Sequence, residues 1–208
     1  MIPSSGLGRT LTIQQDPSTT TGSISLGKGL PAFITGNQQN NINLVVNAAG
    51  SPNYLGDPKI GLYGDSNSGI SNLTLDTTPG NSGVGHVEAD SLITVLRDVK
   101  ITSNLVVIGD GTGVDGISSS GGSISITTLG GTGQVVFANA DNTLAAPAGS
   151  ITVNGNMAVT TAGNNLTLQS GTTTVSGTTG DSSGTLTFGT VTIDSTGSVT
   201  FNGAVGLD

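Results

Sequence analysis

The sequence predicts an all-β protein wound as a single parallel β-helix, or β-solenoid, and three observations lead to this expectation. Apolar residues recur in pairs two positions apart, as at Ile151 and Val153 or at Leu166 and Leu168, which is the spacing of a short strand with one buried side. Gly, Asn, Ser and Asp separate these pairs, and they turn a chain at low cost. Aromatic residues make up only 3% of the chain, and the narrow column inside stacked coils needs few large rings.

The spacing of the apolar runs sets the expected number of coils. Comparable runs recur about every 20 residues, which predicts about ten coils. At about 4.8 Å per coil, the stack would be a rod roughly 50 Å long. We expect one domain over residues 1–208, with looser coils and short loop excursions in 1–100 and more regular coils in 101–208.

The first 76 residues are expected to form short strands around one loop excursion. Two alternating runs lie within residues 11–26, separated by Asp16 and Pro17, which favour a turn. Further runs occupy residues 33–35, 42–46 and 69–76. Between them, residues 48–57 (AAGSPNYLGD) are expected to leave the coil, because Pro52 cannot donate a hydrogen bond to a strand ladder.

A second loop excursion is expected over residues 77–90 (TTPGNSGVGHVEAD), which lead into a longer apolar segment. That segment, residues 91–105 (SLITVLRDVKITSNL), is the only apolar run that could be mistaken for a helix. Its β-branched residues favour strand instead. We therefore expect two successive strands, with Arg97 and Asp98 at the corner between them.

From residue 105 onward, short strands are expected to follow one another closely. Apolar runs occupy residues 105–108, 124–128 and 134–137. The later pairs that define strands are Ile151/Val153, Met157/Val159, Leu166/Leu168, Leu186/Phe188, Val191/Ile193 and Val199/Phe201. Asn43, Asn104 and Asn165 each precede Leu, and we expect them to stack as Asn ladders at corners. Residues 172–174, Thr190 and Thr192 are expected on the outside of strands, without the continuous register of an ice-binding face.

Charge and targeting features bound the classes of function. The net charge is −8, and the basic residues are Arg9, Lys28, Lys59, Arg97 and Lys100. Without a basic patch, binding to nucleic acid or to anionic membrane lipid is not expected. The absence of Cys fits bacterial surface proteins that cross envelopes unfolded. No apolar stretch suits membrane insertion and residues 1–9 lack signal-peptide features, so we expect Met1 to begin a piece of a larger protein.

Four segments carry a family resemblance: GSITVNGN, NNLTLQSG, GTLTFGTVTID and GSVTFNGAVG. They resemble the repeats of filamentous-haemagglutinin-like exoproteins and autotransporter passengers, the large secreted β-helical proteins of Gram-negative bacteria. The likeness is strongest from Gly121 onward and weakest over residues 48–90, and the NPNG-type motifs of that group's secretion domain are not visible in the sequence. The resemblance implies a right-handed parallel β-helix outside the cell, used for adhesion, biofilm formation or contact with other cells.

One segment is similar to a calcium-binding repeat. Residues 110–117 (DGTGVDGI) nearly match the calcium nonapeptide of RTX β-rolls, with Asp110 where a Gly belongs. Asp110 and Asp115, with backbone carbonyls, would offer the hard oxygen ligands that calcium prefers. The alternative is a Gly/Asp turn between coils, since those rolls share each ion between tandem copies and this chain has one. No other cofactor is expected.

Two further groups of residues are candidates for contacts with a ligand. His86, Glu88 and Asp90 alternate, so on a strand they would point the same way and could hold a metal or perform acid–base chemistry. A solvated loop is the alternative. Tyr54 and Tyr63 are the only tyrosines and could stack on a sugar or a protein, or pack within their loops.

The expected function is a non-enzymatic, secreted or surface-displayed bacterial stalk or adhesin segment. Its partner would be a glycan or protein on a host or neighbouring cell. The first alternative is a self-assembling subunit of an extracellular filament, sheath or matrix, with copies associating end to end. The second is a polysaccharide-active enzyme, which would need at least three carboxylates within about 10 Å on one face. We do not expect an enzyme, because the acids are scattered and residues 101–208 contain no Lys or Arg.

Overall fold

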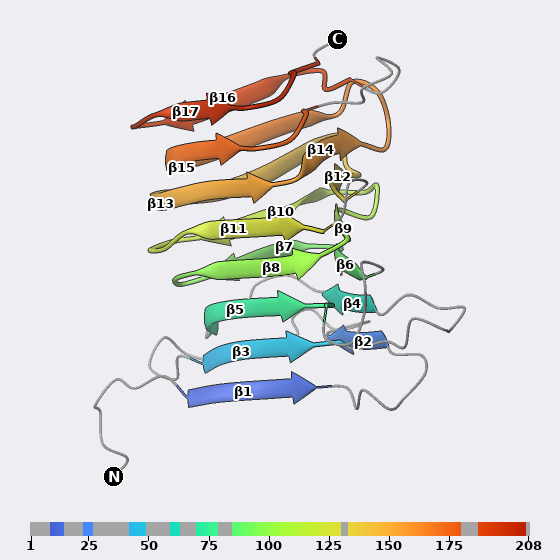
Figure 1. The fold of residues 1–208 in the computed structure, drawn as a ribbon, viewed down its shortest axis with the longest axis vertical. Coiled ribbons are helices and arrows are strands. Elements are labelled where there is room, and N and C mark those ends of the chain that lie inside the picture. Colours follow the sequence, from blue (N-terminus) through green and yellow to red (C-terminus); the bar gives the residue numbers. More distant parts are fainter. Residues whose placement is uncertain are drawn as a thin grey trace.

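The chain is an all-β protein whose parallel strands stack into a β-solenoid (Figure 1). The computed structural model describes residues 9–14, 23–26, 42–48, 59–62, 70–78, 85–129, 133–179 and 187–206. Every strand pairing within these ranges is parallel, and none of their residues is helical. Parallel pairing between segments that follow one another requires the chain to return to the same side after each strand, and winding as a coil meets this requirement.

The strands form three faces. Face 1 contains β1 (Arg9–Gln14), β3 (Ile42–Asn47), β5 (Ile70–Asp76), β8 (Val99–Ser103), β11 (Ile124–Thr128), the second halves of β13 (Asp141–Asn154) and β15 (Asn165–Val175), and β17 (Val199–Phe201). Face 2 contains β2 (Ser23–Leu26), β4 (Lys59–Leu62), β6 (His86–Ala89), β9 (Leu105–Ile108), β12 (Gln134–Phe137) and β14 (Asn156–Val159). Face 3 contains β7 (Leu92–Val95), β10 (Val114–Ser119), the first halves of β13 and β15, and β16 (Val191–Ser195).

The described residues complete about five three-sided turns. On face 1 these turns begin at the register partners Leu73, Val99, Ile124, Ile151 and Thr173. Successive partners on this face lie between 22 residues apart, as for Ile151 and Thr173, and 33 residues apart, as for Leu11 and Leu44. The expected count of about ten coils is not confirmed, because each coil uses more than the anticipated 20 or so residues.

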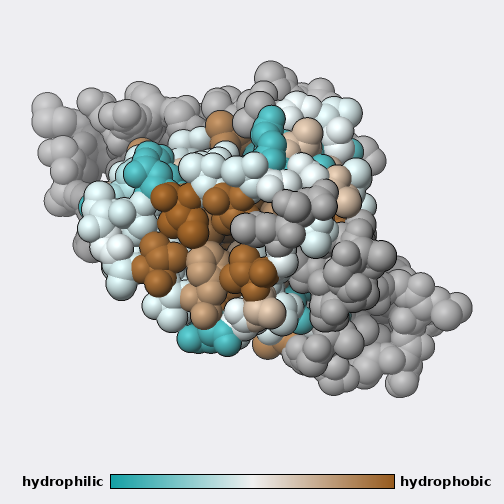
Figure 2. All heavy atoms as spheres, turned by 90° about the horizontal axis from the view of Figure 1, so that it is seen from above, coloured by the Kyte–Doolittle hydropathy of each residue, from teal (hydrophilic) through white to brown (hydrophobic). Residues whose placement is uncertain are grey.

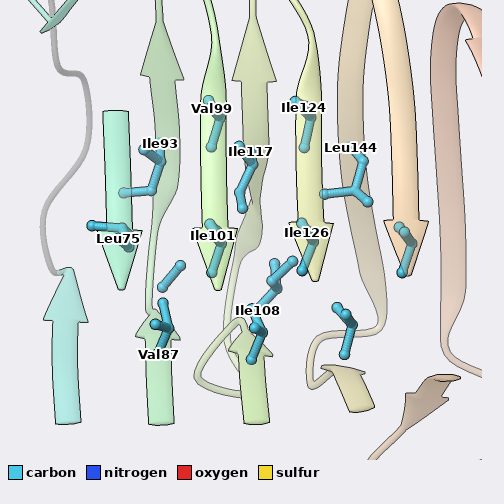
Figure 3. Close-up of a cluster of buried hydrophobic side chains, with 14 of the residues drawn as sticks. Leu75, Val87, Ile93, Val99, Ile101, Ile108, Ile117, Ile124, Ile126 and Leu144 are labelled. Atoms are coloured by element: carbon cyan, nitrogen blue, oxygen red, sulfur yellow. The ribbon is translucent and has the colours of Figure 1, made fainter. Parts of the chain in front are cut away.

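The core is a column of aliphatic side chains along the axis. Along strands such as β6, β7, β9 and β14, buried inward residues alternate with half-buried outward residues, as strand geometry requires. Val99 and Ile101 of β8 lie in the same files as Ile124 and Ile126 of β11 (Figure 3), and all four are at most 1% exposed. Each coil therefore covers the apolar side chains of the coil before it.

Several strands lie where the sequence predicts them. Residues 105–108, 124–128 and 134–137 are β9, β11 and β12. The two strands expected in 91–105 are β7 and β8, with Arg97 and Asp98 exposed at the corner. The expected excursion over 77–90 is wrong at its end, because His86–Ala89 form β6 and bury Val87 and Ala89 in the core. The run at 33–35 and residues 49–57 of the excursion expected over 48–57 lie outside the described residues, while Ala48 is buried in the core.

Glycine stacks upon glycine at two corners of the coil. One ladder consists of Gly122, Gly149, Gly171 and Gly197, and the other of Gly155, Gly177 and Gly203. A Cβ added at Gly149 would lie 2.2 Å from the carbonyl oxygen of Gly122, and one at Gly177 would lie 2.4 Å from that of Gly155. The coils thus approach at these corners more closely than a side chain permits.

Substitution in a ladder should therefore destabilise the stack. We expect Gly149→Ala to lower the free energy of unfolding by about 1–3 kcal/mol, since the new methyl group overlaps backbone that cannot rotate away. Gly206→Ala is the matched control, because its Cβ would meet nothing nearer than 3.6 Å. Urea unfolding followed by circular dichroism measures both. Equal midpoints for the two variants would contradict the close approach.

Candidate functional site

The calcium-like segment forms a tight corner between β9 and β10. Gly109, Gly111 and Gly113 have φ angles of 97°, 91° and 83°, a region that L side chains rarely adopt. This conformation leaves Asp110 exposed at the corner while Asp115, at the start of β10, is 6% exposed. The segment was predicted either to bind calcium or to turn the chain, and the turn is present.

Asp110 stabilises this turn locally. The hydroxyl of Thr112 donates to Asp110 Oδ1 at 2.7 Å, and the N–H of Thr112 donates to the same oxygen at 2.8 Å. These two hydrogen bonds hold the pKa of the Asp110 carboxyl below its ordinary value, and the bond from the Thr112 hydroxyl has the larger effect. The carboxylate therefore acts as the acceptor of an Asx turn.

The corner is fixed by Asn139, a fully buried residue of the next coil. Its side-chain nitrogen Nδ2 lies 2.8 Å from Asp115 Oδ2, 3.2 Å from the Thr112 carbonyl oxygen and 3.3 Å from that of Gly113. Its oxygen Oδ1 accepts a hydrogen bond of 2.7 Å from the N–H of Gly111. One amide thus binds four groups of the segment, in the way that a cation would gather oxygen ligands.

This arrangement bears directly on the calcium prediction. Asp115 and two carbonyl oxygens do converge, but they converge on the Asn139 amide, whereas Asp110 accepts from Thr112. A calcium ion at this place would have to displace that amide. Binding of calcium by Asp110 and Asp115 stays a prediction, and the geometry favours a structural corner.

Other Asn side chains also donate hydrogen bonds to residues of a neighbouring coil. Asn142, 1% exposed, donates from Nδ2 to the carbonyl oxygens of Asn139 at 2.7 Å and Asn165 at 3.0 Å. Elsewhere, Asn72 Nδ2 donates to Asn43 Oδ1 at 2.8 Å. Asn43 therefore takes part in an Asn ladder as expected, whereas the side chain of Asn165 donates to Asp141 Oδ1 at 2.8 Å. These bonds fix the register of neighbouring coils.

His86 and Glu88 alternate with buried residues on β6 and so lie on the outer side of face 2, and the half-buried Asp90 directly follows that strand. The register partners of His86 are Lys59 and Leu105, and those of Glu88 are Gly61 and Val107. Among the described residues, no group of three or more His, Cys, Asp or Glu side chains is placed to hold a metal ion. Tyr54 and Tyr63 lie outside the described residues.

The outer side of face 1 carries a line of polar side chains that sequence reasoning did not find. In register order this outer file is Thr12, Val45, Thr74, Lys100, Ser125, Thr152, Thr174 and Thr200. Thr does not occupy every coil of this file, but the four positions from Ser125 to Thr200 all carry hydroxyls. Beside it runs a second file of Gln14, Asn47, Asp76, Thr102, Thr127 and Asn154. Neighbouring coils are about 4.8 Å apart, so these groups form a regular polar surface.

No protein-family model, curated protein or solved structure matches this chain. Within the part of the chain that the structure describes, no helix has the length and apolar character needed to cross a membrane. The features of the chain that can indicate a function are the outer file of face 1 and the two ends of the described stack.

Proposed function

We propose that the chain is a non-enzymatic, secreted or surface-displayed bacterial stalk or adhesin segment that attaches through face 1. The observation that carries this proposal is the outer file, in which hydroxyls of four successive coils stand in register from Ser125 to Thr200. The family resemblance of the repeats supports an extracellular location. A glycan on a host or neighbouring cell is the partner that this surface suits best.

The chemistry of the outer file matches an extended sugar chain. Hydroxyl groups of Ser and Thr both donate and accept hydrogen bonds, as do the hydroxyls of a polysaccharide. Their spacing of about 4.8 Å is held by backbone ladders rather than by flexible loops, so the surface loses little conformational entropy on binding. From Ser125 to Thr200 the side chains are short, which leaves this part of the face open to a ligand that lies along the rod.

A matched pair of double variants tests this assignment. Thr152→Val with Thr174→Val removes two hydroxyls from the outer file, whereas Thr143→Val with Thr167→Val removes two register-paired hydroxyls from face 3. Since each hydrogen bond contributes about 1 kcal/mol, we expect the face 1 variant to bind glycan roughly tenfold more weakly or worse. The face 3 variant should bind as the unaltered chain does.

The measurement is a glycan array followed by titration of the strongest hit. Equal affinity of the face 1 variant and the unaltered chain would contradict attachment through this face. Failure of the unaltered chain to bind any glycan, together with failure to bind cultured cells, would contradict the adhesive function as a whole.

A further inference from the structure

The C-terminal end of the stack exposes a section of its apolar column. Ile193 of β16, Val199 of β17 and Val205 are 38%, 39% and 44% exposed, and Val191 and Phe201 beside them are half-buried. Figure 2 views this end along the axis and shows apolar residues gathered at its centre, with polar residues around them.

These residues occupy inward positions, and no coil covers them among the described residues. Ile193 is the register partner of Leu168, and Phe201 is the partner of Val175. Both partners are fully buried. Val205 lies over Thr179, which is 2% exposed. The last described coil therefore presents the surface that every inner coil presents to its neighbour.

The N-terminal end presents the complementary surface. β1 and β2 are the outermost strands of their sheets, and each is paired on one side only among the described strands. Leu11 is 45% exposed although its partner Leu44 is fully buried. Ile13 and Ile24 are partly buried, while their partners Val46 and Ile60 are fully buried.

We propose that the C-terminal end of one copy binds the N-terminal end of a second copy, so that the coil stack continues across the junction. Extension of the face 1 register places Leu11 of the next copy over Val199 and Ile13 over Phe201. Extension of face 2 places Ile24 over Val205. The strands would pair in parallel, and the unpaired backbone groups of both edges would gain partners.

Charge supports this head-to-tail orientation over pairing of like ends. Residues 1–100 hold all five Lys and Arg together with seven Asp and Glu, a net charge of −2, whereas residues 101–208 hold six Asp and no basic residue, a net charge of −6. Arg9 begins β1 at one end, and Asp194 lies in β16 at the other. Two C-terminal ends facing each other would therefore bring more negative charge together than a C-terminal end facing an N-terminal end.

A head-to-tail junction does not close on itself when the rotation between copies is small. Each bound copy offers a new free end of the same kind, so association continues into a filament. The lateral faces stay exposed in such a filament, and the outer file of face 1 would run along its whole length. This self-association is independent of glycan binding and can be tested without it.

Two single variants isolate the two ends. Val199→Lys alters the C-terminal surface and Leu11→Lys alters the N-terminal surface, and both positions are already partly exposed, so the fold should tolerate them. Thr200→Lys and Thr12→Lys are the matched controls, because these exposed neighbours alternate with the inward positions on the same strands. Each inward Lys should raise the concentration for half-association at least about tenfold, since a charge would be buried in an apolar junction.

Sedimentation velocity over a wide concentration range provides the readout. The unaltered chain and both controls should form concentration-dependent polymers, and each inward variant alone should remain monomeric. An equimolar mixture of the two inward variants should form dimers and nothing larger, because one intact C-terminal end meets one intact N-terminal end. A monomeric unaltered chain, a Leu11→Lys variant that still dimerises, or a mixture without dimers would each overturn the proposal.

Discussion

Replacement of Phe137 by Ala is expected to lower the free energy of unfolding by about 3–5 kcal/mol. Phe137 is fully buried in β12 and packs edge to face against Phe188, with ring centroids 5.9 Å apart. Loss of the ring leaves a cavity that short aliphatic neighbours cannot fill, and it also removes the aromatic contact. Because every coil rests on the one before it, the cavity weakens the middle of the stack.

Phe201→Ala is the control for this prediction. Phe201 is half-buried in the last described strand, so its removal forfeits less buried area and opens no closed cavity. Urea unfolding followed by circular dichroism should place the Phe137→Ala midpoint well below that of Phe201→Ala. Midpoints in the opposite order would show that the column is not the main source of stability.

The second large effect is expected at Asn139. Asn139→Ala removes an amide that binds Gly111, Thr112, Gly113 and Asp115, and the lost hydrogen bonds should cost about 2–4 kcal/mol of unfolding free energy. The corner between β9 and β10 should also become more mobile, because its glycines adopt their positive φ angles against this side chain.

Asn202→Ala provides the comparison for the Asn139 variant, since Asn202 is exposed and its loss should change stability by no more than about 0.5 kcal/mol. Hydrogen exchange at the amide of Gly111, which donates to Asn139 Oδ1, reports on the corner itself. Unchanged protection of that amide in Asn139→Ala would contradict the role given to this side chain.

The strands were predictable because their signal is local. Apolar alternation within four or five residues identified Ile124–Thr128 and Gln134–Phe137 correctly. The number of coils was not predictable in this way, because it depends on which runs share a coil. β13 is an example, because it passes from face 3 to face 1 as one strand, Asp141–Asn154. The corner between these two faces therefore leaves no gap in the strand pattern.

The site residues were likewise predictable only where the residues that interact are close in the sequence. The turn at Asp110 was visible in the sequence, because its Gly residues and its Asx acceptor are neighbours. Asn139 was not, because it binds Asp115 from 24 positions away, and only the register between coils brings the two together. The outer file of face 1 was missed for the same reason: Thr152, Thr174 and Thr200 are unremarkable until the coils are aligned.

Parallel stacking of successive coils is tested most directly by engineered disulfides, since the chain contains no Cys. Thr127 and Asn154 are register partners on the outer side of face 1, about 4.8 Å apart, which is within disulfide range. Antiparallel pairing about Ser125 and Thr152 would instead bring Thr127 beside Ser150, which parallel pairing holds roughly 13 Å away. Under mild oxidation at low protein concentration, Thr127→Cys with Asn154→Cys should form an intramolecular disulfide, and Thr127→Cys with Ser150→Cys should stay reduced. The reverse result would contradict the coiled, parallel arrangement on which the proposed surfaces depend.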